Sequence, residues 1–174
     1  FRSRSEGEEN QMWLQFLTIL LRELGLPDPE PSLLYRLLQR GRDFRRWWEP
    51  FPDTRPVLDA LQARGFRLGV VSNWEPSLET LMRELELERY FEVAVISALV
   101  GVHKPDPAIF RLALRRLSLH PEQVVYVGNN YEIDVVGARR AGITPVLLDR
   151  DGVYIGVDCL RIQALEELTD LLVR

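Results

Sequence analysis

Short apolar runs alternate with helical segments through the second half of the chain, and this alternation constrains the fold more than any other feature. The valine-rich runs are FRLGVVSN, FEVAVIS, QVVYVG and TPVLLD, at residues 66–73, 91–97, 123–128 and 144–149. Near-continuous apolar runs of this length are typical of parallel strands that are covered on both faces. Strands that alternate with helices predict an α/β fold with a doubly wound parallel sheet.

Helices are predicted between these strands and in front of them. Apolar residues at helical spacing predict helices at 8–24, 31–41, 57–65, 76–87, 106–119, 134–142 and 162–173. Gly25 and Pro27 end the first of these helices, and Gly65 ends the third. We therefore predict a helical segment over residues 1–52, followed by an α/β core over residues 53–174.

Composition narrows the class of partner. The 174 residues are 46% hydrophobic and 28% charged, which suits a packed core. The net charge of −4 argues against a nucleic-acid partner, since that would need a basic face. No apolar run approaches the roughly 18 residues of a membrane span, so no membrane partner is expected. The single cysteine, Cys159, excludes an internal disulfide and predicts a cytoplasmic protein.

Polar side chains follow the predicted strands, and ligands of doubly wound sheets bind beyond the carboxyl ends of the strands. Ser72 and Asn73 follow the first strand, Lys104 follows the second, and GNNYEID follows the third. A hydroxyl and an ammonium can bind phosphate oxygens, whereas a carboxylate such as Asp134 can hold Mg²⁺. This combination predicts phosphoryl chemistry.

Three of these stretches resemble motifs of the haloacid dehalogenase superfamily of hydrolases. VVSNW, at 70–74, resembles its second motif, and VGVHKPDPAIF, at 100–110, resembles its third. VGNNYEIDVVGARRAG, at 127–142, resembles the fourth, which is usually G-D-x-x-x-x-D followed by G-A-x-x-A-G. The likeness runs from about residue 53 to residue 151, and the helices before it resemble the helical cap of the phosphatase-like subgroup.

The resemblance implies a role for each matching position. Ser72 and the backbone of Asn73 would bind the transferring phosphoryl group, and Lys104 would neutralise its charge. Asp134 would hold Mg²⁺, with Asn129 as a weaker ligand in place of an aspartate. Two further residues, Trp74 and Asn130, are assigned to the substrate side of the site, although Trp74 could instead pack under the cap. The implied reaction passes through a phosphoaspartyl intermediate and is assisted by Mg²⁺.

Two features depart from the family pattern. The first motif, D-x-D after an apolar strand, is not found upstream of the cap segment, so we expect the chain to be a fragment of a longer protein. Asp149-x-Asp151-Gly after the last strand would be its counterpart in a circularly permuted enzyme, but a turn is favoured there. Asn129 also replaces the first aspartate of the fourth motif, which removes a negative charge from the metal site.

Three functions are compared on these grounds. The first is a Mg²⁺-dependent phosphatase acting on a small phosphorylated metabolite. The second is a metal-independent 2-haloacid dehalogenase, which the amides at positions 129 and 130 favour. The third is a catalytically degenerate binding protein. A homodimer would be favoured if Trp47 and Trp48 form an exposed surface.

Overall fold

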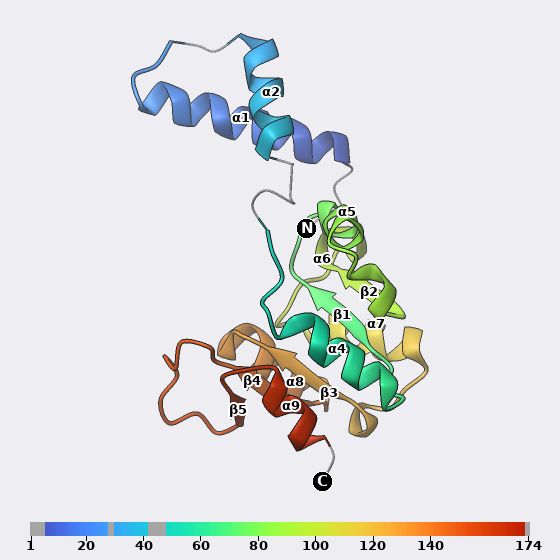
Figure 1. The fold of residues 1–174 in the computed structure, drawn as a ribbon. Coiled ribbons are helices and arrows are strands. Elements are labelled where there is room, and N and C mark those ends of the chain that lie inside the picture. The colour runs from blue at the N-terminus through green and yellow to red at the C-terminus, as the bar shows by residue number, and fades with distance from the viewer. Residues whose placement is uncertain (1–5, 28–29, 42–47, 173–174) are drawn as a thin grey trace.

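The computed structural model describes residues 6–27, 30–41 and 48–172. Two helices near its N-terminal end, α1 (Glu6–Glu23) and α2 (Pro31–Gly41), pack against each other and stand apart from the α/β portion (Figure 1). After α1 the backbone turns at Gly25, whose φ of 73° suits a glycine, as the sequence predicts. The boundary between cap and core at residue 52 stays a prediction.

The α/β portion contains the four predicted strands, so the predicted fold class is confirmed. Parallel strands are flanked by helices in this portion (Figure 1). The strands are β1 (Gly69–Ser72), β2 (Val93–Ile96), β3 (Val125–Gly128), β4 (Thr144–Leu148) and a short fifth, β5 (Leu160–Ile162). The helices are α4 (Thr54–Ala63), α5 (Ser77–Glu84), α6 (Ser97–Val100), α7 (Pro107–Leu117), α8 (Val136–Arg140) and α9 (Glu166–Leu171). A π-helix, η3 (Tyr131–Val135), leads into α8, and 3₁₀ turns lie at Glu88–Tyr90 and Pro121–Gln123.

The described strands form two parallel sheets. β1 pairs with β2, with Gly69 opposite Val93. The second sheet has the order β3-β4-β5, with Val125 opposite Thr144 and Val146 opposite Leu160. β1 and β3 are therefore each paired on one edge within the described residues.

The end of the chain differs from the sequence prediction. Residues 160–162 form β5, although residue 162 was expected to begin a helix, and α9 begins only at Glu166. The backbone N–H of Asp149, just after β4, donates to the Ile162 carbonyl at 2.8 Å, so pairing with β4 decides the conformation. β4 consequently lies between β3 and β5.

Two apolar clusters stabilise the α/β portion. One joins Ile109, Phe110 and Leu114 of α7 to Val95 of β2 and Ala138 of α8. The other joins α4 and α9 to the second sheet, and its buried members are Val57, Leu61, Val146, Ile162 and Leu168. Among the described helices, none combines the length and apolar character needed to cross a bilayer.

Candidate functional site

The predicted site residues lie in loops at the carboxyl ends of β1 and β3 and in the loop before α7. Asn73, which follows β1, holds the loop before α7 in place through two hydrogen bonds. Its amide Nδ2 donates to the Lys104 carbonyl at 2.9 Å, and its Oδ1 accepts the Lys104 N–H at 2.7 Å. This reciprocal pair fixes the backbone of Lys104, so Asn73 positions the lysine through its side chain as well as standing beside Ser72.

Lys104 and Asp134 form a buried ion pair. Lys104 Nζ lies 2.7 Å from Asp134 Oδ1, and the two side chains are only 11% and 4% exposed. The Tyr126 hydroxyl accepts from Nζ at 2.9 Å and lies 3.2 Å from the same carboxylate oxygen. Burial raises the pKa of the Tyr126 hydroxyl, and the neighbouring Asp134 charge raises it further, so the hydroxyl stays protonated. A buried ion pair needs further hydrogen bonds to offset the lost hydration of its two charges, and the Tyr126 hydroxyl provides them here.

The loop after β3 is shaped to bring Asp134 against the strand. The Asn130 side chain accepts from the Ile133 N–H at 3.0 Å, which caps the π-helix, and the Asn130 N–H donates to Asp134 Oδ2 at 3.0 Å. A side chain at Gly128 would place its Cβ 2.4 Å from the Asp134 Cβ and Cγ. Glycine therefore permits the close approach of this carboxylate to the end of β3.

The remaining predicted residues surround this centre. Ser72 is half-buried at the end of β1, and Asn129 is exposed and lines a cavity together with Asn130. The Trp74 N–H donates to Ser97 Oγ at 3.1 Å, and its ring meets Trp48 edge to face with centroids 5.2 Å apart. Trp47 lies outside the described residues. Trp74 thus connects the end of β1 to the segment that leads from the helical hairpin.

A second buried ion pair was missed by sequence reasoning. The Asp53 carboxylate, 7% exposed, accepts from the two guanidinium nitrogens of Arg150 at 2.8 and 2.9 Å and from the Leu165 N–H at 2.9 Å. The guanidinium also stacks over the Phe51 ring at 4.1 Å. Hydrogen bonding to Arg150 holds the pKa of Asp53 below its usual value, against the effect of burial. No local pattern signals a pair 97 residues apart.

The residues present do not by themselves fit a complete Mg²⁺ site. Within the described part of the chain, no three acidic, histidine or cysteine side chains gather around a common point. Among the residues that the structure describes, Asp134 is the carboxylate that meets Lys104, and its two oxygens already face Lys104, Tyr126 and the Asn130 N–H. Since Mg²⁺ is held by one or two carboxylates with several waters, another acidic group would be needed beside Asn129.

Comparison with known proteins places these motifs in a family. The family model described as haloacid dehalogenase-like hydrolase matches residues 6–142. A glyceraldehyde 3-phosphate phosphatase of Methanopyrus kandleri is 40% identical over 135 residues, which cover 76% of this chain and 57% of the relative. The chain thus spans little more than half the length of that relative.

Solved structures agree in fold. A HAD phosphatase from Thermococcus onnurineus superposes with a TM-score of 0.71 at 26% identity, covering 93% of this chain and 89% of the other. A 2-haloacid dehalogenase from Pseudomonas syringae pv. Tomato DC3000 superposes with a TM-score of 0.73 at 29% identity, covering 95% of this chain and 71% of the other. With its motifs, its parallel strands and these relatives, the chain belongs to the haloacid dehalogenase-like hydrolases.

Proposed function

We propose that this chain carries the phosphate-binding half of a phosphatase that acts on a small phosphorylated metabolite. The observation that carries the proposal is the buried Lys104 ammonium, which is paired with Asp134, while Asn73 beside Ser72 fixes the backbone of Lys104. The relative from Methanopyrus kandleri is named glyceraldehyde 3-phosphate phosphatase, and this name supports a small phosphorylated metabolite as the substrate class.

The described residues would bind and orient the phosphoryl group. An ammonium has three donors, and Lys104 directs two of them to Asp134 and Tyr126, which leaves one for a phosphoryl oxygen. The Ser72 hydroxyl at the end of β1 would donate to a second oxygen. Because charged hydrogen bonds in a site of low dielectric are strong, these groups would stabilise charge that develops in the transition state. The nucleophile would come from a segment outside the described residues.

Mg²⁺ is the proposed cofactor only if such a segment adds a carboxylate. Bound there, the metal would shield the negative charges of the acids and the phosphate. Asn129 would then contribute an amide oxygen, and Asp134 would act mainly by holding Lys104.

The test is hydrolysis of an aryl phosphate by the full-length protein, with and without EDTA. We expect hydrolysis that is lost in EDTA and that falls at least about 100-fold in Lys104→Gln, the range for removal of one electrostatic group. Arg115→Gln, which changes an exposed residue of α7, serves as the matched control and should keep full activity. Absence of hydrolysis at every Mg²⁺ concentration would refute the proposal.

The incomplete metal site favours one second candidate, a metal-independent 2-haloacid dehalogenase. Asn129 is an amide where a metal-binding acid is expected, and one of the similar structures is a 2-haloacid dehalogenase. Release of chloride from 2-chloropropionate in the presence of EDTA would support this function. If neither substrate turns over while inorganic phosphate still raises the melting temperature, a binding protein without catalysis is indicated.

A further inference from the structure

The Tyr126 hydroxyl lies where polar groups from three different segments of the chain meet. It accepts from Lys104 Nζ at 2.9 Å, and it lies 3.1 Å from the Val71 carbonyl oxygen and 3.2 Å from Asp134 Oδ1. A tyrosine hydroxyl has a single proton, so the Val71 and Asp134 oxygens share it while the lone pairs face the ammonium. Tyr126 thus contacts both members of the buried ion pair and also the end of β1.

The ring that carries this hydroxyl is held by packing. It meets the fully buried Phe110 of α7 edge to face, with ring centroids 4.9 Å apart. Phe110 lies in turn against Gly137 of α8, where an added Cβ would come within 2.7 Å of the Phe110 ring. The position of the Tyr126 ring is therefore set by contacts with the core, and these contacts do not involve Lys104.

The Lys104 side chain needs a fixed partner because it is long and flexible. Asn73 fixes the backbone of Lys104, but the flexible four-carbon stem separates that backbone from Nζ. With Asp134 as its single partner, Nζ could swing around the carboxylate oxygen. The second hydrogen bond, to Tyr126, fixes the position of Nζ, so the third N–H of the ammonium has one defined direction.

The residue type at position 104 is consistent with a need for defined geometry. Lys104 is the only lysine in the sequence, and every other strongly basic side chain is an arginine. An arginine would supply the same charge, but its planar fork of five donors does not match the place of a compact ammonium between one carboxylate oxygen and one hydroxyl. The direction of the donors therefore matters at this position as well as the charge.

We propose that Tyr126 is a positioning residue of the phosphate site, whose hydroxyl holds the Lys104 ammonium so that the free N–H points toward the phosphoryl oxygen. Tyr126 acts through the lysine and does not touch the substrate. Its effect on hydrolysis rests on the proposed function, whereas its hold on the ammonium is a property of the folded chain. Since a displacement of about 1 Å in a catalytic group can lower the rate about 100-fold, loss of the hydroxyl should affect turnover more than substrate binding.

The test compares Tyr126→Phe with Tyr90→Phe in the full-length protein. Tyr90 is a matched control, because it is 2% exposed at the amino end of β2 and its hydroxyl donates to the Asp59 carboxylate at 2.9 Å. Each change deletes a hydroxyl that contacts a carboxylate, so both variants should melt roughly 2–4 °C below wild type. Only Tyr126→Phe should lower kcat for an aryl phosphate, by about 10- to 100-fold, with KM changed less than about threefold. An equal loss of kcat in Tyr90→Phe would overturn the proposal.

The Lys104→Gln background separates positioning from a general loss of structure. If Tyr126 acts through the lysine, Tyr126→Phe should lower kcat by less than about twofold once residue 104 is glutamine. A further fall of about tenfold or more in that background would show that the hydroxyl acts independently of Lys104, and this would overturn the proposal.

A second readout does not depend on catalysis. In protein with isotope-labelled lysine, the NMR signal of the Lys104 ammonium is assigned by its loss in Lys104→Gln. We expect the ammonium protons to exchange with water at least about tenfold faster in Tyr126→Phe than in wild type, and at the wild-type rate in Tyr90→Phe. Equal exchange in wild type and Tyr126→Phe would overturn the proposal. If the full-length protein hydrolyses no phosphate ester, faster exchange in Tyr126→Phe still supports the hold on Lys104 and counts against the phosphatase alone.

Discussion

At the scale of single residues, the site depends on one close contact between a strand and the loop that follows it. Gly128 ends β3, and the Asp134 side chain folds back onto it. The carboxylate then meets Lys104 inside the protein instead of in water. Gly128 is not a member of the ion pair, but its lack of a side chain allows Asp134 to take the position in which it meets Lys104.

Gly128→Ala tests this dependence. The added Cβ would lie 2.4 Å from Asp134, so the carboxylate must move, and overpacking of this kind costs about 1–3 kcal/mol of unfolding free energy. We expect lower stability in urea denaturation and loss of the hydrolysis proposed for the full-length protein. Gly69→Ala is the matched control, since its Cβ would meet the nearest atom at 3.4 Å. Equal behaviour of the two variants would show that the close contact is unimportant.

Asp53→Asn tests the second ion pair through pH. The pKa of Asp53 is lowered below its ordinary 3.8 in the folded protein, so the carboxylate stabilises the fold above about pH 4. That contribution is lost as pH falls through the folded pKa. We expect wild type to exceed the variant by about 2 kcal/mol at pH 6, and the difference to shrink below pH 4.

Urea denaturation at pH 6, 4 and 3 measures this difference. Glu92→Gln is the control, because its partner Arg67 and Glu92 are both about half exposed, at 46% and 47%. Screening by water makes such surface pairs weak. A difference between wild type and Asp53→Asn that stays constant down to pH 3 would contradict the assignment.

At the scale of elements, the π-helix η3 is the unusual part of the fold. It places Asp134 on the inner side of the loop, and α8 continues directly from it. The Asn130 cap begins this turn, which assigns the side chain a structural use. Its predicted contact with substrate stays a prediction.

Asn130→Ala should loosen this turn. Loss of a capping side chain costs about 1 kcal/mol, and Asn130→Asp should keep the cap because it retains the accepting oxygen. We expect faster amide exchange at Ile133 and Asp134 in the alanine variant only. Unchanged exchange in that variant would show that the cap does not hold η3.

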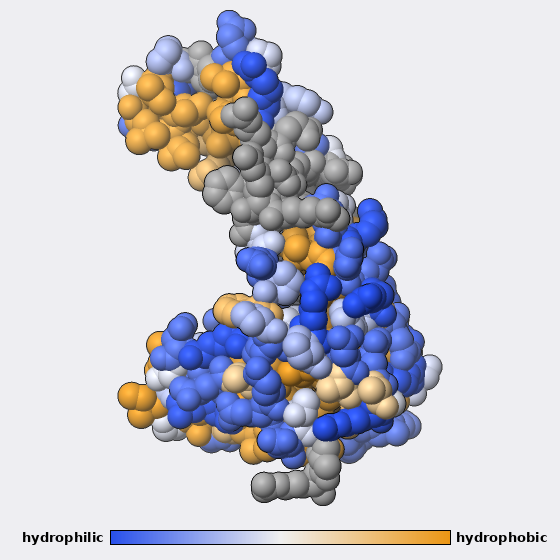
Figure 2. Space-filling model, viewed as in Figure 1, coloured by the Kyte–Doolittle hydropathy of each residue, from blue (hydrophilic) through white to orange (hydrophobic). Residues whose placement is uncertain are grey.

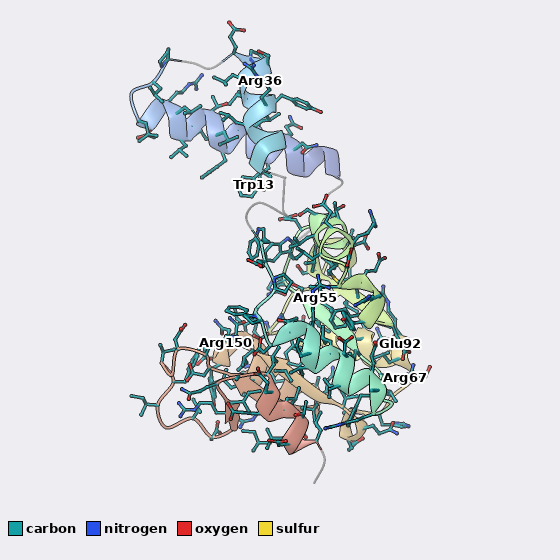
Figure 3. The ribbon with its side chains drawn as sticks, viewed as in Figure 1. Trp13, Arg36, Arg55, Arg67, Glu92 and Arg150 are labelled. Carbon is teal, nitrogen blue, oxygen red and sulfur yellow. The ribbon has the colours of Figure 1, made fainter. Side chains whose placement is uncertain are left out.

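At the scale of the whole molecule, the helical hairpin of α1 and α2 carries several large exposed apolar side chains. Phe16, Ile19 and Leu20 share one side of α1 and are 51%, 58% and 41% exposed. Figure 2 shows hydrophobic residues gathered over the hairpin. Figure 3 shows the hairpin side chains and, on the α/β portion, the surface pair of Arg67 and Glu92 and the labelled Arg150. Large exposed apolar patches generally mark surfaces for association, and we infer such a surface here.

We therefore expect the chain to self-associate as its concentration rises, and Ile19→Glu to weaken this. Sedimentation velocity between 5 and 200 µM measures the effect, which should be at least about tenfold in the dissociation constant, since one buried aliphatic side chain contributes roughly 1.5–3 kcal/mol. Gln15→Glu adds the same charge at an exposed polar position of α1 and should change little. A chain that remains monomeric at every concentration would rule out this interface.

The sequence by itself determined the fold class, the positions of four of the five described strands and the loops that carry Ser72, Lys104 and Asp134. These features depend on local periodicity and on glycine and proline, which act over a few residues and can be read directly. The ion pair of Lys104 and Asp134 could also be predicted from the sequence, because parallel strands bring their carboxyl ends together.

Only the tertiary structure decided the rest. β5 is three residues long, too short for a periodic signal, and it forms because β4 offers an edge. Asp53 and Arg150 meet across 97 positions, and burial rather than local pattern selects that pair. The cavity between β1 and β3 arises from how two sheets pack against three helices. The strand β5, the Asp53–Arg150 pair and the cavity each depend on contacts between segments that are far apart in the chain. The free energy of such contacts cannot be estimated from a short stretch of sequence.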